Sequence, residues 1–315
     1  MIHDILQSEI DSPTEVEQFN RAHIFYDLKN IIKEKYPSGN TLDIYYAFSL
    51  YEKCLRLCRE ERFNLARYWF EKVNKLHSSF SPDLVNFLDI LYSPALAFYH
   101  YKIDEFETAL SLLEQEMKRA DTMLYDKESL RIEFKLEQLI NKFRILHKAG
   151  KKSEATSLAK SIINFIINDS FFADMNGDSI LSVKSENLPN YINWRNYLVN
   201  NIILRFRYDN ELSFEEKLAI YTVIFSNVPL EENEDSLPIK NAFSAIIAYS
   251  SSDMKRFLYL AESAIEMFYL IPKYLQVILL DLLIEAGMID IDLSREYSLK
   301  VLGIKAMVNE IRPSA

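Results

Sequence analysis

The sequence is poor in glycine and proline, the two residues that most often mark turns. Only 5 glycines and 9 prolines occur in 315 residues. Sheet-rich proteins need many such residues, so their scarcity favours long helices joined by short loops. Hydrophobic residues make up 49% of the chain, which is ample for burial and argues against extensive disorder. The composition therefore predicts an all-α protein.

Cysteine is also scarce, and the two cysteines, Cys54 and Cys58, lie four residues apart. Two thiols cannot form the disulfide framework of a small secreted protein, and their scarcity fits a reducing compartment. Their spacing places both on one helix face, but a zinc site also needs a second pair of ligands, and the sequence offers none. We expect both cysteines to be packing residues, and we expect no metal and no cofactor.

Long apolar runs are missing as well. No stretch reaches the roughly 20 apolar residues that a membrane-spanning helix needs. The most apolar late segment, 274–286, is interrupted by Gln276, Asp281 and Glu285. The segment 1–11 carries acidic residues where a signal peptide is basic. We expect a cytoplasmic protein without a membrane partner.

Basic charge is in deficit, and the formal net charge is −10 at pH 7. A field of this sign repels phosphate, so we expect no nucleic-acid partner. Motifs for catalysis are missing too: the five histidines have no paired spacing, and the sequence contains neither a serine nucleophile elbow nor a phosphate-binding glycine loop. We therefore expect a protein that is not an enzyme.

Helical periodicity runs through most of the chain. The segment 12–15, Ser-Pro-Thr-Glu, is a capping box with proline at the first helical position, and it predicts a helix that ends near Tyr36. We predict a single α-helical repeat domain over residues 1–315. Its parts are a capping helix, a set of helix hairpins, an irregular insertion and further hairpins of degenerate sequence, at 1–40, 41–167, 168–190 and 191–315.

The hairpin region contains three predicted helix pairs, at 42–60 with 63–76, 84–101 with 106–117, and 127–149 with 153–167. Later helices are predicted at 191–208, 213–227, 239–249, 253–270, 273–285 and 294–308. Two more capping boxes are predicted, at 104–107 and 213–216. The segment 285–290 is predicted to be another turn between helices, and the irregular insertion could hold a short helix around Ile180.

A small alanine recurs one turn into the second helix of each pair. Ala66, Ala109 and Ala155 follow one another at intervals of 43 and 46 residues. Alanine at this position lets two helices approach closely, because a larger side chain would push them apart. A period of roughly 40 residues with two helices per unit predicts a helical solenoid.

The second helices resemble those of the tetratricopeptide repeat family, which carry an aromatic residue, an alanine three residues on and an aromatic four beyond. The matching positions, with the expected turn glycine of the third pair, are Phe63, Ala66, Phe70, Phe106, Ala109, Leu113 and Gly150. The resemblance covers roughly residues 42–167, and the period here is longer than the family's roughly 34 residues. It implies a right-handed α-solenoid of antiparallel hairpins with a peptide-binding concave face.

In such a solenoid one face of each first helix lines the concave groove. Counting from the alanines gives these candidate partner-binding residues: Tyr51, Arg59, Phe98, Tyr101, Lys102, Arg144, His147 and Lys148. Aromatic side chains beside a basic stripe suit a peptide with an acidic end. The alternative is structural, because Arg59, Lys102 and Lys148 each lie in the last turn of a helix, where the helix dipole favours cations.

Three hypotheses for function follow. The first is a protein- or peptide-binding scaffold that uses the concave face. The second is a peptide-sensing regulatory receptor without a DNA-binding module, similar to the tetratricopeptide-type pheromone sensors of bacteria. The third is an accessory subunit of a biosynthetic enzyme complex. In each, the expected partner is another protein or a peptide, and the sequence does not indicate an oligomeric state.

Overall fold

The computed structural model describes residues 22–36, 41–168, 172–173, 179–181, 191–225 and 237–289. Most of these residues are helical, so the prediction of an all-α protein is confirmed. The chain divides into two compact units, Asn20–Leu158 and a second made mainly of residues from Ala159 onward. The sequence predicts one continuous repeat domain. In the structure the boundary between the two units, at Leu158 and Ala159, falls inside the helix at Lys152–Asn168.

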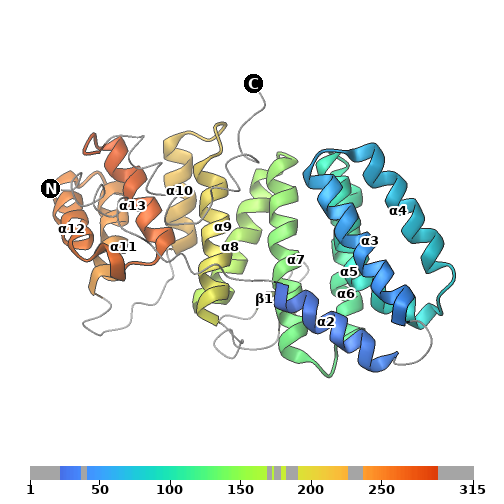
Figure 1. Ribbon diagram of the computed structural model, residues 1–315. Helices are drawn as coiled ribbons and strands as arrows, with labels where there is room; N and C mark the ends of the chain where they lie inside the picture. The colour runs from blue at the N-terminus through green and yellow to red at the C-terminus, as the bar shows by residue number, and fades with distance from the viewer. Residues whose placement is uncertain are drawn as a thin grey trace. The chain divides into compact units, whose positions relative to one another are not determined.

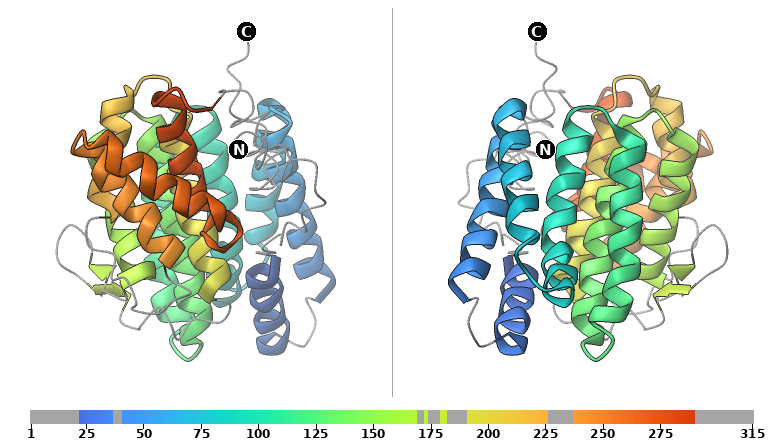
Figure 2. Two further views of the ribbon diagram at one scale, coloured as in Figure 1. Left: turned by 90° about the vertical axis from the view of Figure 1, so that its left-hand side faces the viewer. Right: turned by 90° about the vertical axis from the view of Figure 1, so that its right-hand side faces the viewer.

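Among its described residues, the first unit contains six helices and the beginning of a seventh, which Figure 1 labels. Their bounds are α2 Ala22–Lys35, α3 Thr41–Arg59, α4 Phe63–His77, α5 Pro82–Lys102, α6 Phe106–Met123, α7 Glu128–Lys148 and α8 Lys152–Asn168. The three predicted helix pairs are confirmed, and the largest difference is that α6 continues past its predicted end at 117. α3 pairs with α4 and α5 with α6, and the two hairpins lie side by side (Figure 2).

Local sequence explains how the α3–α4 hairpin docks on α5. The buried residues of α4 are Ala66, Phe70, Val73 and His77, which recur every three or four positions and so form one stripe. α5 begins at a defined point because the Ser81 side chain accepts a hydrogen bond from the Leu84 N–H, with Pro82 at the first helical position.

The turns between paired helices share one backbone conformation. In the first unit Glu61, Asp104 and Gly150 have φ of 58°, 62° and 72°. The N–H of each following residue donates to the carbonyl five positions earlier, in the bonds Arg62 to Leu57, Glu105 to His100 and Lys151 to Leu146. This is the Schellman motif, which satisfies carbonyls at a helix end. The alanine repeat therefore accompanies a repeated backbone turn.

The same turn occurs in the second unit, where the alanine pattern is lost. Ser252 and Gly287 have φ of 59° and 71°. The following residues, Asp253 and Met288, donate their N–H to Ala248 and Leu283. The prediction of a turn at 285–290 is thus confirmed for its described residues, 285–289.

Replacing Gly150 with alanine is expected to destabilise the first unit by about 1 kcal/mol, because an L side chain disfavours φ of +72°. A Cβ at this position meets nothing within 4 Å, so the cost is conformational. Ser252→Gly, at φ of 59° in the second unit, is the converse change and is expected to stabilise that unit by a similar amount. Urea denaturation measures both, and a stability equal to that of the unmodified chain in either variant would contradict the expectation.

One predicted helix cap is wrong. The capping box expected at 104–107 is absent, because the N-cap of α6 is Glu105 and it makes no side-chain cap hydrogen bond. Asp104 instead adopts the left-handed turn conformation, and its carboxylate pairs with Lys148 Nζ at 2.7 Å.

The second unit contains the remaining described elements, with bounds β1 Phe172–Ala173, β2 Ser179–Leu181, α9 Tyr191–Arg207, α10 Phe214–Phe225, α11 Leu237–Ser250, α12 Met254–Glu266, η3 Phe268–Leu270 and α13 Lys273–Glu285. β1 and β2 pair antiparallel, so the suggested helix around Ile180 is wrong.

The capping box at 213–216 is confirmed. The Ser213 N–H donates to Glu216 Oε2 at 2.8 Å, and the Glu216 N–H donates to Ser213 Oγ at 3.2 Å. The capping box at 12–15 and the helix at 294–308 lie outside the described residues.

The recurring alanines are packing residues, as predicted. Ala66, Ala109 and Ala155 are fully buried. A side chain of this size lets neighbouring helices pack closely. Among the described helices, none is both long and apolar enough to cross a membrane.

Candidate functional site

The lysines predicted to line a groove lie at the turns, where they join one hairpin to the next. Lys102, at the end of α5, is 3.6 Å from Glu61 in the α3–α4 turn. Lys148, at the end of α7, is 2.7 Å from Asp104 in the α5–α6 turn. The Lys148 ammonium also stands 4.8 Å from the centre of the Tyr101 ring. These pairs indicate a structural role that differs from the predicted interaction with the helix dipole, since here the cations hold the turns of neighbouring hairpins.

The other predicted residues are less uniform. Tyr51 is a correction, because its side chain is only 4% exposed and a partner cannot reach it. Arg59 is exposed at the end of α3. The remaining candidates are half-buried and contact their own helices: Phe98 with Tyr101 at 6.1 Å between ring centres, His147 with Phe143 at 6.1 Å, and Arg144 with Asn141 at 3.1 Å.

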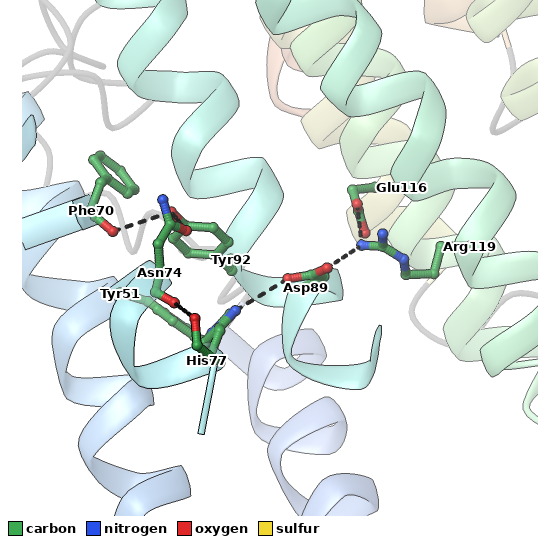
Figure 3. A network of polar contacts seen from close by, with 9 residues as sticks. Tyr51, Phe70, Asn74, His77, Asp89, Tyr92, Glu116 and Arg119 are labelled. Carbon is green, nitrogen blue, oxygen red and sulfur yellow. Dashed lines mark hydrogen bonds and ion pairs between the residues drawn. The ribbon is translucent and has the colours of Figure 1, made fainter. Parts of the chain in front are cut away.

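A buried polar network joins the four helices α3 to α6 (Figure 3). Tyr51 Oη on α3 and His77 Nε2 on α4 are hydrogen-bonded at 2.6 Å. His77 Nδ1 faces Asp89 Oδ1 on α5 at 3.5 Å. A proton on Nδ1 would face this carboxylate and leave Nε2 to accept from Tyr51. Beside this pair, Tyr92 Oη donates to Asn74 Oδ1 at 2.8 Å.

The network ends at α6 in an acidic pair that shares one arginine. Arg119 Nη1 lies 3.1 Å from Asp89 Oδ2 and 2.5 Å from Glu116 Oε1. Glu116 is 1% exposed. Burial raises the pKa of the Glu116 carboxyl to about 7, although the Arg119 charge acts in the opposite direction. Glu116 therefore titrates near neutral pH.

The order Tyr51, His77, Asp89 has the chemistry of a nucleophile, a base and an orienting acid. Burial, with Asp89 and Tyr92 nearby, raises the pKa of the Tyr51 phenol far above its usual value, which opposes ionisation. Tyr51 and His77 are both buried, so a substrate would have no access. This geometry favours a role in holding α3, α4, α5 and α6 together.

The two cysteines are also core residues. Cys54 and Cys58 are free thiols with 0% exposure. Burial raises the pKa of the Cys54 thiol to about 12 and that of Cys58 to about 11. Both therefore remain protonated and unreactive near neutral pH, in line with the interpretation of the pair as packing residues.

The second unit has its own buried charge cluster. Arg207 Nε on α9 lies 2.6 Å from Asp281 Oδ1 on α13. Lys217 Nζ on α10 donates to the Arg207 carbonyl at 2.7 Å. Burial raises the pKa of Asp281, against the charges of Arg207 and Lys217. Burial also lowers the pKa of Lys217. This cluster links three helices through charges that are costly to desolvate.

Three aromatic rings on α3 and α4, two of them exposed and one half-buried, each lie beside a lysine of α2, α3 or α4. Lys53 Nζ stands 3.3 Å from the centre of the Trp69 ring, and Tyr68 packs against Trp69 at 5.4 Å between ring centres. The other two stacks are Lys33 over Tyr45 at 4.7 Å and Lys72 over Tyr68 at 5.3 Å. We call these six residues the aromatic–lysine face: Lys33, Tyr45, Lys53, Tyr68, Trp69 and Lys72.

The aromatic–lysine face is partly open to solvent: Tyr45, Tyr68 and Lys72 are exposed, whereas the other three residues are half-buried. Tyr45 and Tyr68 are each 47% exposed, and Tyr46 next to them is 53% exposed. The stacks connect three helices, because Lys33 extends from α2 to Tyr45 on α3 and Lys53 from α3 to Trp69 on α4. Single exposed apolar side chains are ordinary, but aromatic residues are enriched at binding surfaces, and an ammonium over an aromatic ring is attracted to it.

Comparison of the chain with protein-family models, with curated proteins and with solved structures finds no match in any of the three. The resemblance to tetratricopeptide repeats therefore remains a prediction based on the residues quoted for it.

Sequence reasoning missed the aromatic–lysine face. Its tyrosines, Tyr45 on α3 and Tyr68 on α4, stand among apolar residues in the sequence, and only the packing shows that they are exposed. One signal was present: α2, α3 and α4 together contain nine Lys or Arg and only five Asp or Glu, in a chain of net charge −10. A local excess of basic residues in an acidic chain could have drawn attention to these helices.

Proposed function

We propose that the chain is a non-enzymatic scaffold that binds another protein or a peptide, and that it does so through the aromatic–lysine face. The observation that supports this is the set of three rings, two of them exposed and one half-buried, each stacked with a lysine. Tyrosine and tryptophan contribute most of the energy at many protein interfaces, since they bury large areas at a small entropic cost. The finer parts of the proposal are a right-handed, tetratricopeptide-like solenoid and a cytoplasmic location.

This face is a better candidate than the predicted groove residues. Tyr51 is buried, and Lys102 and Lys148 already pair with acidic side chains. Reversing either lysine charge would place a carboxylate beside Glu61 or Asp104. Such a variant would disturb the turns as well as any bound partner, so it would not test binding alone.

Binding through the face is tested with the double variant Tyr45→Ala/Tyr68→Ala. The full chain is used to select binders from a library of random peptides, and fluorescence anisotropy measures their affinities. We expect the double variant to bind the selected peptides about tenfold or more weakly, because it removes two exposed rings at the interface.

The matched control is Tyr125→Ala/Tyr259→Ala, which removes two tyrosines that are 75% and 73% exposed elsewhere on the chain. This variant should bind the peptides as the unmodified chain does. A selection that yields no binder would count against a peptide-binding function. Peptides that bind the Tyr45/Tyr68 variant with unchanged affinity would show that the face is not the site.

A further inference from the structure

We infer that the occupant of the aromatic–lysine face is an acidic segment of a partner protein, in which Asp or Glu side chains accompany apolar ones. This inference rests on the function proposed above and adds the chemical class of the partner. It follows from the charge of the three helices and from the state of their lysines.

The lysines of the face contact aromatic rings. Among the described residues, no carboxylate pairs with Lys33, Lys53 or Lys72, and each instead stands over an aromatic ring. Lys29 on α2 shows the contrast, because its Nζ pairs with Glu52 at 2.7 Å. An ammonium has three donors, so one that lies over a ring keeps donors for an incoming carboxylate.

Charge complementarity favours an acidic occupant. The helices that carry the face have nine Lys or Arg against five Asp or Glu, whereas the whole chain has a net charge of −10. An acidic segment is repelled by most of the chain and attracted to this region, which directs it to the face. A basic segment would bring its cations next to Lys33, Lys53 and Lys72, at a cost in free energy.

The same features favour a protein over a nucleic acid. Double-stranded DNA carries one charge per about 1.7 Å of helix axis, so its repulsion by the acidic remainder of the chain extends along its length. A peptide can place two or three carboxylates over the lysines and apolar side chains over Tyr45, Tyr68 and Trp69. The alternation of ring and ammonium on the face suits that pattern.

The peptides selected on the full chain test this inference by their composition. We expect Asp and Glu to be enriched over the starting library, together with apolar residues. We expect the affinity of the selected peptides to fall as salt is raised, because charge pairs at a solvent-exposed face are screened.

The variant Lys53→Gln/Lys72→Gln should bind the selected peptides about tenfold more weakly than the unmodified chain does. The control variant Lys118→Gln/Lys255→Gln changes two exposed lysines, on α6 and α12, and should bind them with unchanged affinity.

The outcomes separate the partner class from the function itself. Neutral or basic peptides that still depend on Tyr45 and Tyr68 would overturn the acidic partner and leave the scaffold function standing. If the variant Lys53→Gln/Lys72→Gln binds the selected peptides with unchanged affinity, the acidic partner is likewise overturned and the scaffold function still stands. Two further results would overturn the inference. The first is binding of single-stranded oligouridylate that the variant Tyr45→Ala/Tyr68→Ala abolishes. The second is self-association in sedimentation experiments that Lys53→Gln/Lys72→Gln abolishes, since the occupant would then be a second copy of the chain.

Discussion

Replacing Asp281 with asparagine is expected to destabilise the second unit by about 3 kcal/mol or more. Asp281 accepts the Arg207 Nε–H at 2.6 Å, and both side chains are largely buried. Removal of the carboxylate takes the nearest negative charge from a buried guanidinium, which then loses the interaction that offset its desolvation. The loss should be largest for α9 and α13, which this pair joins.

Hydrogen exchange is the suitable measurement, together with equilibrium denaturation, because two compact units need not unfold in one step. Amides of α9 and α13 should lose protection while those of α3 to α6 keep it. Glu285→Gln is the control, since Glu285 is exposed at the end of the same helix. Its effect should stay within about 0.5 kcal/mol.

The double variant Arg207→Met/Asp281→Leu gives a second check. Apolar residues that replace a whole buried ion pair remove both desolvation costs at once. This variant should therefore be more stable than Asp281→Asn. If instead it is less stable, the destabilisation by the single change does not come from an unbalanced charge.

The stability of the first unit is expected to fall as the pH rises from about 4.5 to above 7, by up to about 3 kcal/mol, through Glu116. The pKa of this carboxyl is 4.5 in its ordinary state and about 7 in the folded chain. Between these values the folded chain holds a proton that the unfolded chain has lost, so protons favour folding. The contribution is fully present below pH 4.5 and is lost as the pH passes through 7.

Glu116→Gln should remove this pH dependence, because the amide does not titrate. Urea denaturation at several pH values between 4.5 and 8 measures the slope for the unmodified chain and the variant. The groups that act on the Glu116 charge are Arg119, Ser93 and Asp89, so a change in slope reports on the network in Figure 3. Glu114→Gln, an exposed change on the same helix, should leave the slope intact. An unchanged slope in Glu116→Gln would show that another group titrates.

Helix positions could be predicted closely from the sequence. The starts and ends of α3, α4, α9 and α13 fall within one residue of prediction, because their signals are local. α6 shows the limit of such reasoning. The sequence predicts an end at 117, but the buried Ala120 continues the apolar face of α6, and the buried Leu124 caps the helix. Arg119 fits in this stretch because Asp89 and Glu116 bind it, and Asp89 lies on another helix.

The candidate site was less predictable. Lys102 and Lys148 were placed correctly in the last turns of their helices, but their partners Glu61 and Asp104 lie in earlier turns and leave no mark near the lysines. Tyr45 and Tyr51 both lie on α3, about 120° apart around the helix axis, and Tyr51 is buried whereas Tyr45 is open to solvent. Periodicity identifies a face of a helix, and the neighbouring helices determine whether that face is covered.

The sequence by itself determined the helical class, the positions of most helices, the repeated turns and the buried alanines. These depend on hydrogen bonds and side-chain sizes within a few residues, which a short window of sequence contains. Only the tertiary structure decided which polar groups meet and which rings stay exposed. Tyr51 and His77 are 26 residues apart in sequence, and Lys33 and Lys53 reach their rings on neighbouring helices. Such contacts form only when helices pack, because the free energy of packing depends on the whole surface that each helix presents.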